Sequence, residues 1–269
     1  MHGRPALIIA HPGHELVLFG WMEKTLPVVS VLTDGSGRDG GSRLSSTLKV
    51  LRETGAEPGD LAGLTDRQFY AAVLEGNLDL FVDLAVRWGD ALAEQRPPYV
   101  AGDAREGFNP AHDICAMIAA AAVARARRSG AVIGHLQFFL FEPHDRHAEA
   151  AGREGICHVL SEEQVRRKIA AAHAYPELAG EVQWNVSGRS PKVLEAYPEL
   201  ASMFDAAIDG IGERSFATEC LLPAGTASPG GDRPFYELYA ERLAADGVYE
   251  QAIRYRRHVQ PIERALAAL

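Results

Sequence analysis

The sequence is poor in cysteine and contains no long apolar run. Three of its 269 residues are cysteines, and Cys115, Cys157 and Cys220 form no CxxC pair. This pattern predicts reduced, mostly buried thiols. No apolar run approaches the roughly 20 residues that a membrane helix needs, and the N-terminal MHGRPALIIA enters structure too soon for a signal peptide. These absences predict a cytoplasmic protein that does not span a membrane.

The chain also lacks a long run of basic residues. It carries 27 Lys and Arg against 36 Asp and Glu, which gives a formal net charge of −9. This acidic balance argues against nucleic acid and anionic membrane as partners. Hydrophobic residues make up 47% of the sequence, so the chain can bury the core of one sizeable domain, with or without an appendage.

Two familiar sequence motifs are missing as well. The HPGHE stretch at 11–15 is neither HExxH nor HxxEH, which excludes a helix-borne zinc protease site. The turn after the first expected strand has no GxGxxG, and the glycine-rich DGSGRDGGS at 34–42 follows the second strand instead. Nucleotide binding is therefore a weak alternative.

Short apolar segments alternate with amphipathic segments in the first part of the chain. The alternation is typical of strands followed by helices, and it predicts an α/β fold with a Rossmann-like parallel sheet flanked by helices. The expected strands are 6–10, 27–35, 98–103 and 135–143, and the expected helices are 14–25, 42–56, 77–95 and 113–130, the last capped by Asp113 and ended by Gly130.

The pattern changes from about residue 160. SEEQVRRKIAAAHAYPEL at 161–178 has a clear helix start, PAGTASPGGDRP at 223–234 is a loop, and 235–269 is expected to be wholly helical. We therefore divide the chain into an α/β metal-binding core over 1–180 and a mostly helical C-terminal part over 181–269, packed on the core.

Polar side chains follow the ends of four expected strands. His11 and His14 come after the first strand, Asp34 after the second, His112 after the third and Asp145 after the fourth. Because open parallel sheets bind ligands at the carboxyl ends of their strands, these residues should converge at one edge. Zinc favours imidazole and carboxylate, with three protein ligands and an open position when it is catalytic. His11 and His14, completed by His112, therefore predict a Zn²⁺ site.

The same segments resemble the LmbE-like (PIG-L) family of zinc-dependent N-deacetylases over roughly residues 5–180. IIAHPGHELVLFGWM, VVSVLTDG, GLTDR, NPAHDICAMIAAAAV and LSEEQVRRKIAAAHAYPEL are similar to the family's motifs and stand in the same order. The resemblance implies that His11 and His112 bind the metal, and that His14 stands where the family has a metal-binding aspartate. Histidine there keeps a ligand and removes one negative charge, so zinc would retain its full +2 charge.

The resemblance also bears on the substrate. Arg43 matches the family's arginine that meets substrate, and we expect Asp34 to border the same pocket. Gly13, however, stands where the family has the aspartate that acts as general base. Asn109 and Ala111 replace a His and an Asp that help to stabilise the oxyanion, although Asn109 can still donate a hydrogen bond. The metal ligands are thus retained, while the proton-transfer residues are largely lost.

Loss of a general base typically costs 10²–10⁴-fold in rate, so the nearby carboxylates are candidate replacements. Glu15 is adjacent, but in the family pattern it supports the site from behind. Asp113 follows His112 directly, and Asp145 lies in PHDRH at a neighbouring strand end. We therefore expect Asp145 or Asp113 to be catalytic, with Asn109 as a hydrogen-bond donor.

These residues favour a zinc-dependent hydrolase that removes an acyl group from an amide nitrogen of an amino sugar or sugar conjugate. Its general base is atypical or missing. The partner is then a small-molecule substrate, and a homo-oligomer is left open. One alternative is a different zinc-assisted reaction in natural-product or glycan biosynthesis. The other is a non-catalytic protein that keeps zinc, or only the fold.

Overall fold

The computed structural model describes residues 3–37, 40–142, 144–147, 151–152, 154–178, 216–225 and 233–269. Most of the first half of the predicted C-terminal part, 181–215, lies outside these residues. So does 226–232 of the predicted loop.

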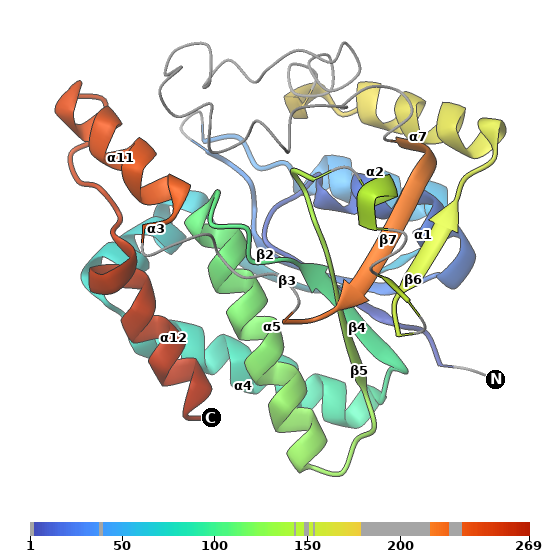
Figure 1. The fold of residues 1–269 in the computed structure, drawn as a ribbon, viewed down its shortest axis with the longest axis horizontal. Coiled ribbons are helices and arrows are strands. Elements are labelled where there is room, and N and C mark those ends of the chain that lie inside the picture. The colour runs from blue at the N-terminus through green and yellow to red at the C-terminus, as the bar shows by residue number, and fades with distance from the viewer. Residues whose placement is uncertain are drawn as a thin grey trace.

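A seven-stranded sheet forms the centre of the described structure, in the order β3-β2-β1-β4-β5-β7-β6 (Figure 1). The strands from β3 to β5 are parallel, whereas β7 runs antiparallel to both β5 and β6. The predicted α/β fold with a Rossmann-like parallel sheet is confirmed, with an antiparallel extension at one edge. The strands are β1 (Ala6–Ile9), β2 (Val28–Thr33), β3 (Glu57–Leu64), β4 (Tyr99–Asp103), β5 (Gly134–Phe138), β6 (Ile156–Val159) and β7 (Thr218–Pro223).

Helices cover both faces of the sheet, so its central strands are apolar throughout. Every residue of β1 is buried; Leu7 and Ile9 enter one core, while Ala6 and Ile8 enter the other. The first core is closed by α1 (Phe19–Thr25), α2 (Leu44–Thr54) and α7 (Glu162–His173), and the second by α3 (Asp66–Glu75), α4 (Leu78–Gln95), α5 (Pro110–Arg128) and α12 (Gln260–Ala267). Of the helices that the structure describes, none has both the length and the apolar character to cross a bilayer.

Helix α5 begins at Pro110, three residues before the predicted start. Asn109 is its N-cap, because the Asn109 side chain accepts a hydrogen bond from the Ala111 N–H at 2.8 Å. Proline at the first helical position favours the same start. The prediction that Asp113 caps this helix is therefore wrong. Asp113 lies inside the helix, and its carboxylate accepts hydrogen bonds from the backbone N–H groups of the preceding loop.

The described C-terminal part is less helical than the sequence predicts. Helix α11 (Phe235–Ala245) ends in a Schellman motif, in which the Val248 N–H donates to the Leu243 carbonyl and Gly247 takes a φ of 71°. Residues 246–254 therefore leave the helix, which contradicts the wholly helical prediction for 235–269. A π-helical turn (Tyr255–Val259) then leads into α12, which packs against α4 and α5 (Figure 1).

Strand β7 carries a buried ion pair that joins three parts of the fold. Lys168 of α7 donates from Nζ to Glu219 at 2.8 Å and to the Val17 carbonyl at 2.6 Å. Glu219 also accepts the backbone N–H groups of Gly20 and Trp21, at 3.0 and 2.6 Å. Lys168 and Glu219 are 4% and 1% exposed, so neither charge has water as an alternative partner.

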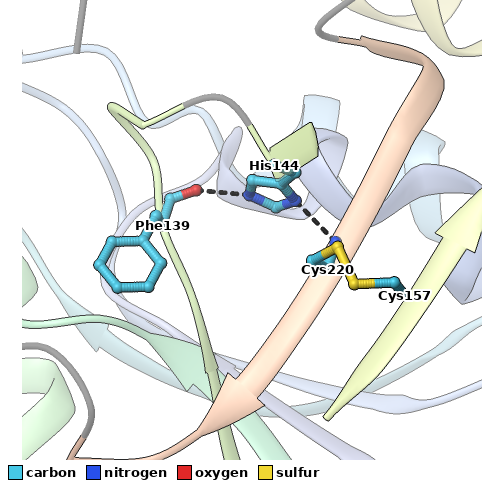
Figure 2. Close-up of a disulfide and its surroundings, with 4 residues drawn as sticks. All are labelled: Phe139, His144, Cys157 and Cys220. Carbon is cyan, nitrogen blue, oxygen red and sulfur yellow. Dashed lines mark hydrogen bonds between the residues drawn. A yellow bond between two sulfur atoms is a disulfide. The ribbon is translucent and has the colours of Figure 1, made fainter. Parts of the chain in front are cut away.

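A disulfide joins Cys157 of β6 to Cys220 of β7, 63 positions apart (Figure 2). The prediction of reduced thiols is therefore wrong for this pair, whereas Cys115 is free and buried as predicted. The two cysteines lie directly opposite each other in the strand register. Their spacing in the sequence gives no sign of this, because it depends on how β7 returns to the sheet.

His144 lies beside this disulfide and has a defined tautomer (Figure 2). Its Nδ1 accepts a hydrogen bond from the Cys220 N–H at 2.9 Å, so Nε2 carries the proton and donates to the Phe139 carbonyl at 2.7 Å. Burial lowers the pKa of His144 from 6.5 to about 4. The neutral ring thus links the end of β5 to β7.

The lowered pKa of His144 predicts a pH dependence of stability. Between pH 6.5 and about 4 the unfolded chain binds a proton that folded His144 does not, so the free energy of unfolding should fall as the pH decreases through this window. His144→Asn keeps an acceptor near the Cys220 N–H and has no proton to bind. We expect the free energy of unfolding, measured with urea from pH 7 to 4.5, to fall less steeply with decreasing pH in His144→Asn than in the unaltered protein. The same pH dependence in both proteins would contradict the assignment.

Candidate metal centre

The order of the sheet reverses between β1 and β4. Chain segments that leave two neighbouring strands in opposite directions open a crevice, and open α/β sheets bind ligands at this point. His11 and His14 follow β1, and Asp103 is the last residue of β4. The strand-end residues of the sequence therefore stand where the fold leaves room for a ligand.

The imidazole rings of His11, His14 and His112 come together at this edge. The ring centres of His11 and His14 are 5.5 Å apart, those of His11 and His112 are 5.3 Å apart, and those of His14 and His112 are 4.5 Å apart. The planes are steeply inclined to each other, by 67° to 89°. The structure thus brings together all three histidines that the sequence assigns to the metal.

His11 is oriented through its Nδ1 atom. That nitrogen lies 2.7 Å from the Thr33 hydroxyl oxygen, and the hydroxyl in turn lies 3.3 Å from the Ala10 carbonyl. Because the hydroxyl donates its hydrogen to the carbonyl, His11 Nδ1 is the donor to Thr33, and Nε2 keeps its lone pair. Asp66 Oδ1 lies 3.5 Å from His11 Nδ1, which also favours the tautomer with the proton on Nδ1.

His14 is held in the same manner by a carboxylate. Its Nδ1 lies 3.0 and 3.1 Å from the two oxygens of Asp103, which also accepts the Ala10 N–H at 2.8 Å. Asp103 is 2% exposed. Carboxylates in this position fix the tautomer of metal-binding histidines and raise their basicity. The Nε2 lone pair of His14 is therefore left for a ligand.

His112 enters the cluster from the first turn of α5 and is buried. Its Nδ1 has no hydrogen-bond partner among the described residues. Burial, and then the neighbouring His14 and His11, lower the pKa of His112 well below 6.5, so the ring is neutral. An unpartnered polar atom at a buried position is costly, and a metal ion is one partner that would satisfy it.

Among the described residues, no group of three or more His, Cys, Asp or Glu side chains is placed so that it could hold a metal ion. The donor set nevertheless suits zinc in kind, with two Nε2 lone pairs and one unpartnered nitrogen. With Zn–N bonds of about 2.0 Å and tetrahedral angles, ring centres would lie about 5 Å apart. The observed ring-centre spacings of 4.5, 5.3 and 5.5 Å lie on either side of this value.

Gly13 lies between the two histidines of the turn and has a φ of 108°. A Cβ atom at this position would overlap Cδ1 of Leu178. The backbone here is held by Glu15, whose buried carboxylate accepts the Gly13 N–H at 2.7 Å. The space beside the Gly13 Cα atom is thus occupied by an apolar side chain, and the backbone there has a conformation that favours glycine.

Gly13→Asp is therefore expected to destabilise the protein and not to create a general base. We expect a loss of roughly 1–3 kcal/mol in the free energy of unfolding, from backbone strain and from overlap with Leu178. Leu178→Ala in the Gly13→Asp background removes the overlapping methyl group and keeps the same backbone conformation. Urea unfolding of Gly13→Asp, of Leu178→Ala and of the double variant therefore separates strain from overlap. Additive losses in the double variant would argue against the overlap.

The three predicted catalytic residues occupy different positions. The Asn109 Oδ1 atom accepts hydrogen bonds from the Ala111 N–H and, at 3.3 Å, from the Tyr70 hydroxyl. Asp113 accepts two N–H groups, and burial raises its pKa to about 6. Asp145 is exposed on the short 3₁₀-helix His144–His147. No described contact joins Asp113 or Asp145 to the three imidazoles, so the structure does not bring them into the cluster.

The two predicted substrate residues flank the turn after β2. Asp34 is buried, and its carboxylate accepts the Ser36 N–H at 3.0 Å, which is the contact of a turn residue. Arg43 is half-buried at the N-cap of α2, and its backbone N–H donates to the Asp34 carbonyl. A Cβ at Gly35 would contact both Pro12 and Arg43. Arg43 therefore lies near the histidine turn.

Sequence reasoning placed Asp103 only among the polar residues at the end of the strand at 98–103, without a specific role, and it gave no role to Asp66 or Thr33. Asp103 ends a buried strand and Thr33 ends β2, so the strand-end rule was the available signal. Asp66 is 7% exposed beside His11, and its only sign was the GLTDR segment. Their roles follow from which strands are neighbours, and that information is absent from a single chain read in order.

No protein-family model matches the sequence, and no curated protein matches it significantly. Among solved structures, the conserved protein TT1542 from Thermus thermophilus is similar, with 15% sequence identity and a TM-score of 0.44. The similarity covers 84% of this chain and 98% of that chain. A likeness at this level carries no information about activity or about a metal.

Proposed function

We propose that the protein is a zinc-dependent hydrolase that removes an acyl group from an amide nitrogen, on an amino sugar or sugar conjugate. The observation that carries the proposal is the convergence of His11, His14 and His112 at the switch point of the sheet. Zinc bound there supplies a Lewis acid for the amide carbonyl and for water. The LmbE-like resemblance supports the same reaction class.

Asp103 gives the proposed site a negative charge that its ligands lack. Histidine in place of the family's aspartate removes a charge from the metal ligands, and Asp103 restores it behind His14, at 3.0 Å from Nδ1. The carboxylate also holds the ring in one orientation. His14 and Asp103 together therefore replace the aspartate in both binding and charge.

Asn109 is the residue of this chain that fits one of the remaining roles. Because Asn109 Oδ1 already accepts two hydrogen bonds, its Nδ2 group is the part that can donate to a substrate oxygen. Asp113 accepts two backbone N–H groups and Asp145 is exposed on a separate short helix, so neither candidate is assigned as the general base. Arg43, near the histidine turn, is the proposed substrate contact.

Metal analysis, followed by an amidase assay, tests this function. We expect one zinc per chain after dialysis against micromolar zinc, and release of acetate from N-acetylated amino sugars. A chain that retains no zinc would overturn the proposal. Zinc retention without turnover of any N-acyl amino sugar would instead favour a non-catalytic zinc protein. The apolar Leu178 side chain beside Gly13 is the observation in favour of that second candidate.

Asp103→Asn is expected to weaken zinc binding by roughly 10–100-fold, because outer-shell carboxylates contribute about that factor to affinity. Asparagine keeps the size of the side chain and an acceptor for the Ala10 N–H, so the fold should survive. Competition with a fluorescent zinc chelator measures the effect. Asp90→Asn is a suitable control, because Asp90 pairs with Arg125 at the surface. Equal affinities in the two variants would remove Asp103 from the proposed site.

A small-molecule substrate is part of the same proposal, whereas the predicted cytoplasmic location conflicts with the disulfide. The net charge of −9 still argues against nucleic acid as a partner. The disulfide between Cys157 and Cys220 argues against a permanently reducing compartment, because such bonds are rare there. Thiol labelling of protein isolated under acid quench decides whether the bond is present in the cell.

A further inference from the structure

Strand β7 has different backbone partners along its length. Its last two residues pair with β5, whereas Thr218–Leu221 pair only with β6 among the described strands. The Cys220 N–H donates to His144 Nδ1 and not to a strand (Figure 2). The first half of β7 is therefore held in place by β6 and by His144 instead of by β5.

Strand β6 is a weak partner apart from its disulfide. It is four residues long and lies at the end of the described sheet, and every one of its residues is half-buried or exposed. Segments with so little buried area open locally at a small fraction of the free energy of global unfolding. The Cys157–Cys220 bond opposes this opening, because it joins β6 to β7 covalently within their ladder.

Glu219 of β7 supplies the cap of helix α1. Leu18 stands at the N-cap of this helix and has no side-chain oxygen to accept a hydrogen bond. The Gly20 and Trp21 N–H groups of the first turn donate to the two oxygens of Glu219 instead. Leu160, the residue after β6, packs against Gly20. The start of α1 is thus supported by both strands that the disulfide joins.

The capped end of α1 is continuous with the turn that carries His14. The 3₁₀-helix His14–Leu18 leads directly into α1. Its Val17 carbonyl accepts a hydrogen bond from Lys168, which is the ion-pair partner of Glu219. Glu219 therefore holds this turn in two ways, through the first turn of α1 and through Lys168.

We propose that the Cys157–Cys220 disulfide is a redox switch for the turn that carries His14. Reduction by a dithiol lets β6 separate from β7, which loosens the Glu219 cap of α1 and, with it, the turn. Cys157 is exposed, whereas Cys220 is 2% exposed, so a reductant approaches from the Cys157 side. The inference does not depend on a bound metal, because its output is the order of the turn.

The switch uses ordinary thiol–disulfide exchange. A thiolate of the dithiol attacks Sγ of Cys157, and a new sulfur–sulfur bond forms as the bond to Cys220 breaks. The Cys220 sulfur leaves with the electron pair and takes up a proton. The second thiol of the reductant then attacks the mixed disulfide, which releases Cys157 and closes the oxidised reductant. Two electrons and two protons thus pass from the dithiol to the two cysteines.

Amide hydrogen exchange of the full chain, followed by NMR without added metal, tests the switch. Millimolar dithiothreitol without urea should reduce the disulfide, which thiol labelling of Cys157 and Cys220 verifies. We then expect the N–H groups of Trp21 and Leu16 to exchange at least about tenfold faster. The Thr33 N–H, which donates to the Ala10 carbonyl in the parallel sheet, should keep its rate. Reoxidation should restore slow exchange.

A double variant, Cys157→Ala with Cys220→Ala, is the matched control. It should exchange at the rates of the reduced protein and should not respond to dithiothreitol. Cys115 is still present in it, free and buried, so a response of this variant to dithiothreitol would overturn the switch. If the variant does not fold, the unaltered chain before reduction, after reduction and after reoxidation gives the same comparison.

The pattern of rates separates a switch from a disulfide that only stabilises the fold. Faster exchange at Trp21 and Leu16 alone, reversed by reoxidation, supports the proposal. Equal acceleration at Thr33 overturns it, because the whole fold is then destabilised. An unchanged rate at Trp21 or Leu16 in the reduced protein also overturns it, as does a disulfide that dithiothreitol reduces only in urea. None of these outcomes bears on zinc, so the proposed function is tested separately.

Discussion

His14→Ala is expected to reduce bound zinc from one equivalent per chain to almost none. The substitution removes one of three proposed ligands and leaves the Asp103 carboxylate buried without the ring that it orients. We expect the affinity for zinc to fall by at least about a thousandfold, or about 4 kcal/mol. Metal analysis after dialysis against a zinc-buffered chelator measures the loss.

Two controls make the zinc result specific. His173→Ala removes an exposed histidine at the end of α7 and should leave the zinc content unchanged. His112→Ala should match His14→Ala, because both rings belong to the same cluster. Full zinc content in His14→Ala would show that the three imidazoles are not the binding site.

Lys168→Met is expected to lower the free energy of unfolding by roughly 3–5 kcal/mol, which is a large loss for one substitution. Removal of the ammonium leaves the Glu219 carboxylate uncompensated at a position that is 1% exposed. The Val17 carbonyl also loses its donor. Urea unfolding at neutral pH should show a lower midpoint with little change in slope.

A second substitution distinguishes the buried charge from lost packing. Glu219→Gln in the Lys168→Met background removes the negative charge and keeps an acceptor for one of the Gly20 and Trp21 N–H groups, which donate to different oxygens, so part of the stability should return. Lys49→Met, at an exposed pair with Glu53, should change stability by less than about 1 kcal/mol. If the double variant is as unstable as Lys168→Met, the loss in the free energy of unfolding comes from packing and not from the buried charge.

Four strands of the parallel sheet could be predicted because they are short, apolar and buried on both faces. β3 could not, because Glu57–Leu64 contains a proline and two glycines and lies at the sheet edge with most of its residues partly or fully exposed. β7 could not either, because its partners are set by the return of the chain from beyond residue 215. The pattern of apolar residues predicts buried strands, but it predicts neither edge strands nor strands that join the sheet after a long connection.

The histidine cluster could be predicted in part for a related reason. A general rule places ligands at the carboxyl ends of parallel strands, so His11, His14 and His112 were assigned together. Asp103 behind His14 depends on β4 lying next to β1, and the Cys157–Cys220 bond depends on β7 lying next to β6. Both are consequences of strand order. Asp145 was assigned by the same strand-end rule, yet the structure leaves it exposed on a separate short helix.

The position of β7 has a consequence for the order in which the chain can fold during synthesis. β5 and β6 do not pair with each other; each pairs with β7, which is made last among the strands of the sheet. Until residue 223 leaves the ribosome, β5 presents an open edge and β6 has no partner. A fragment cut at residue 180 would retain all three histidines but keep this edge exposed, so the unit that folds includes the C-terminal part.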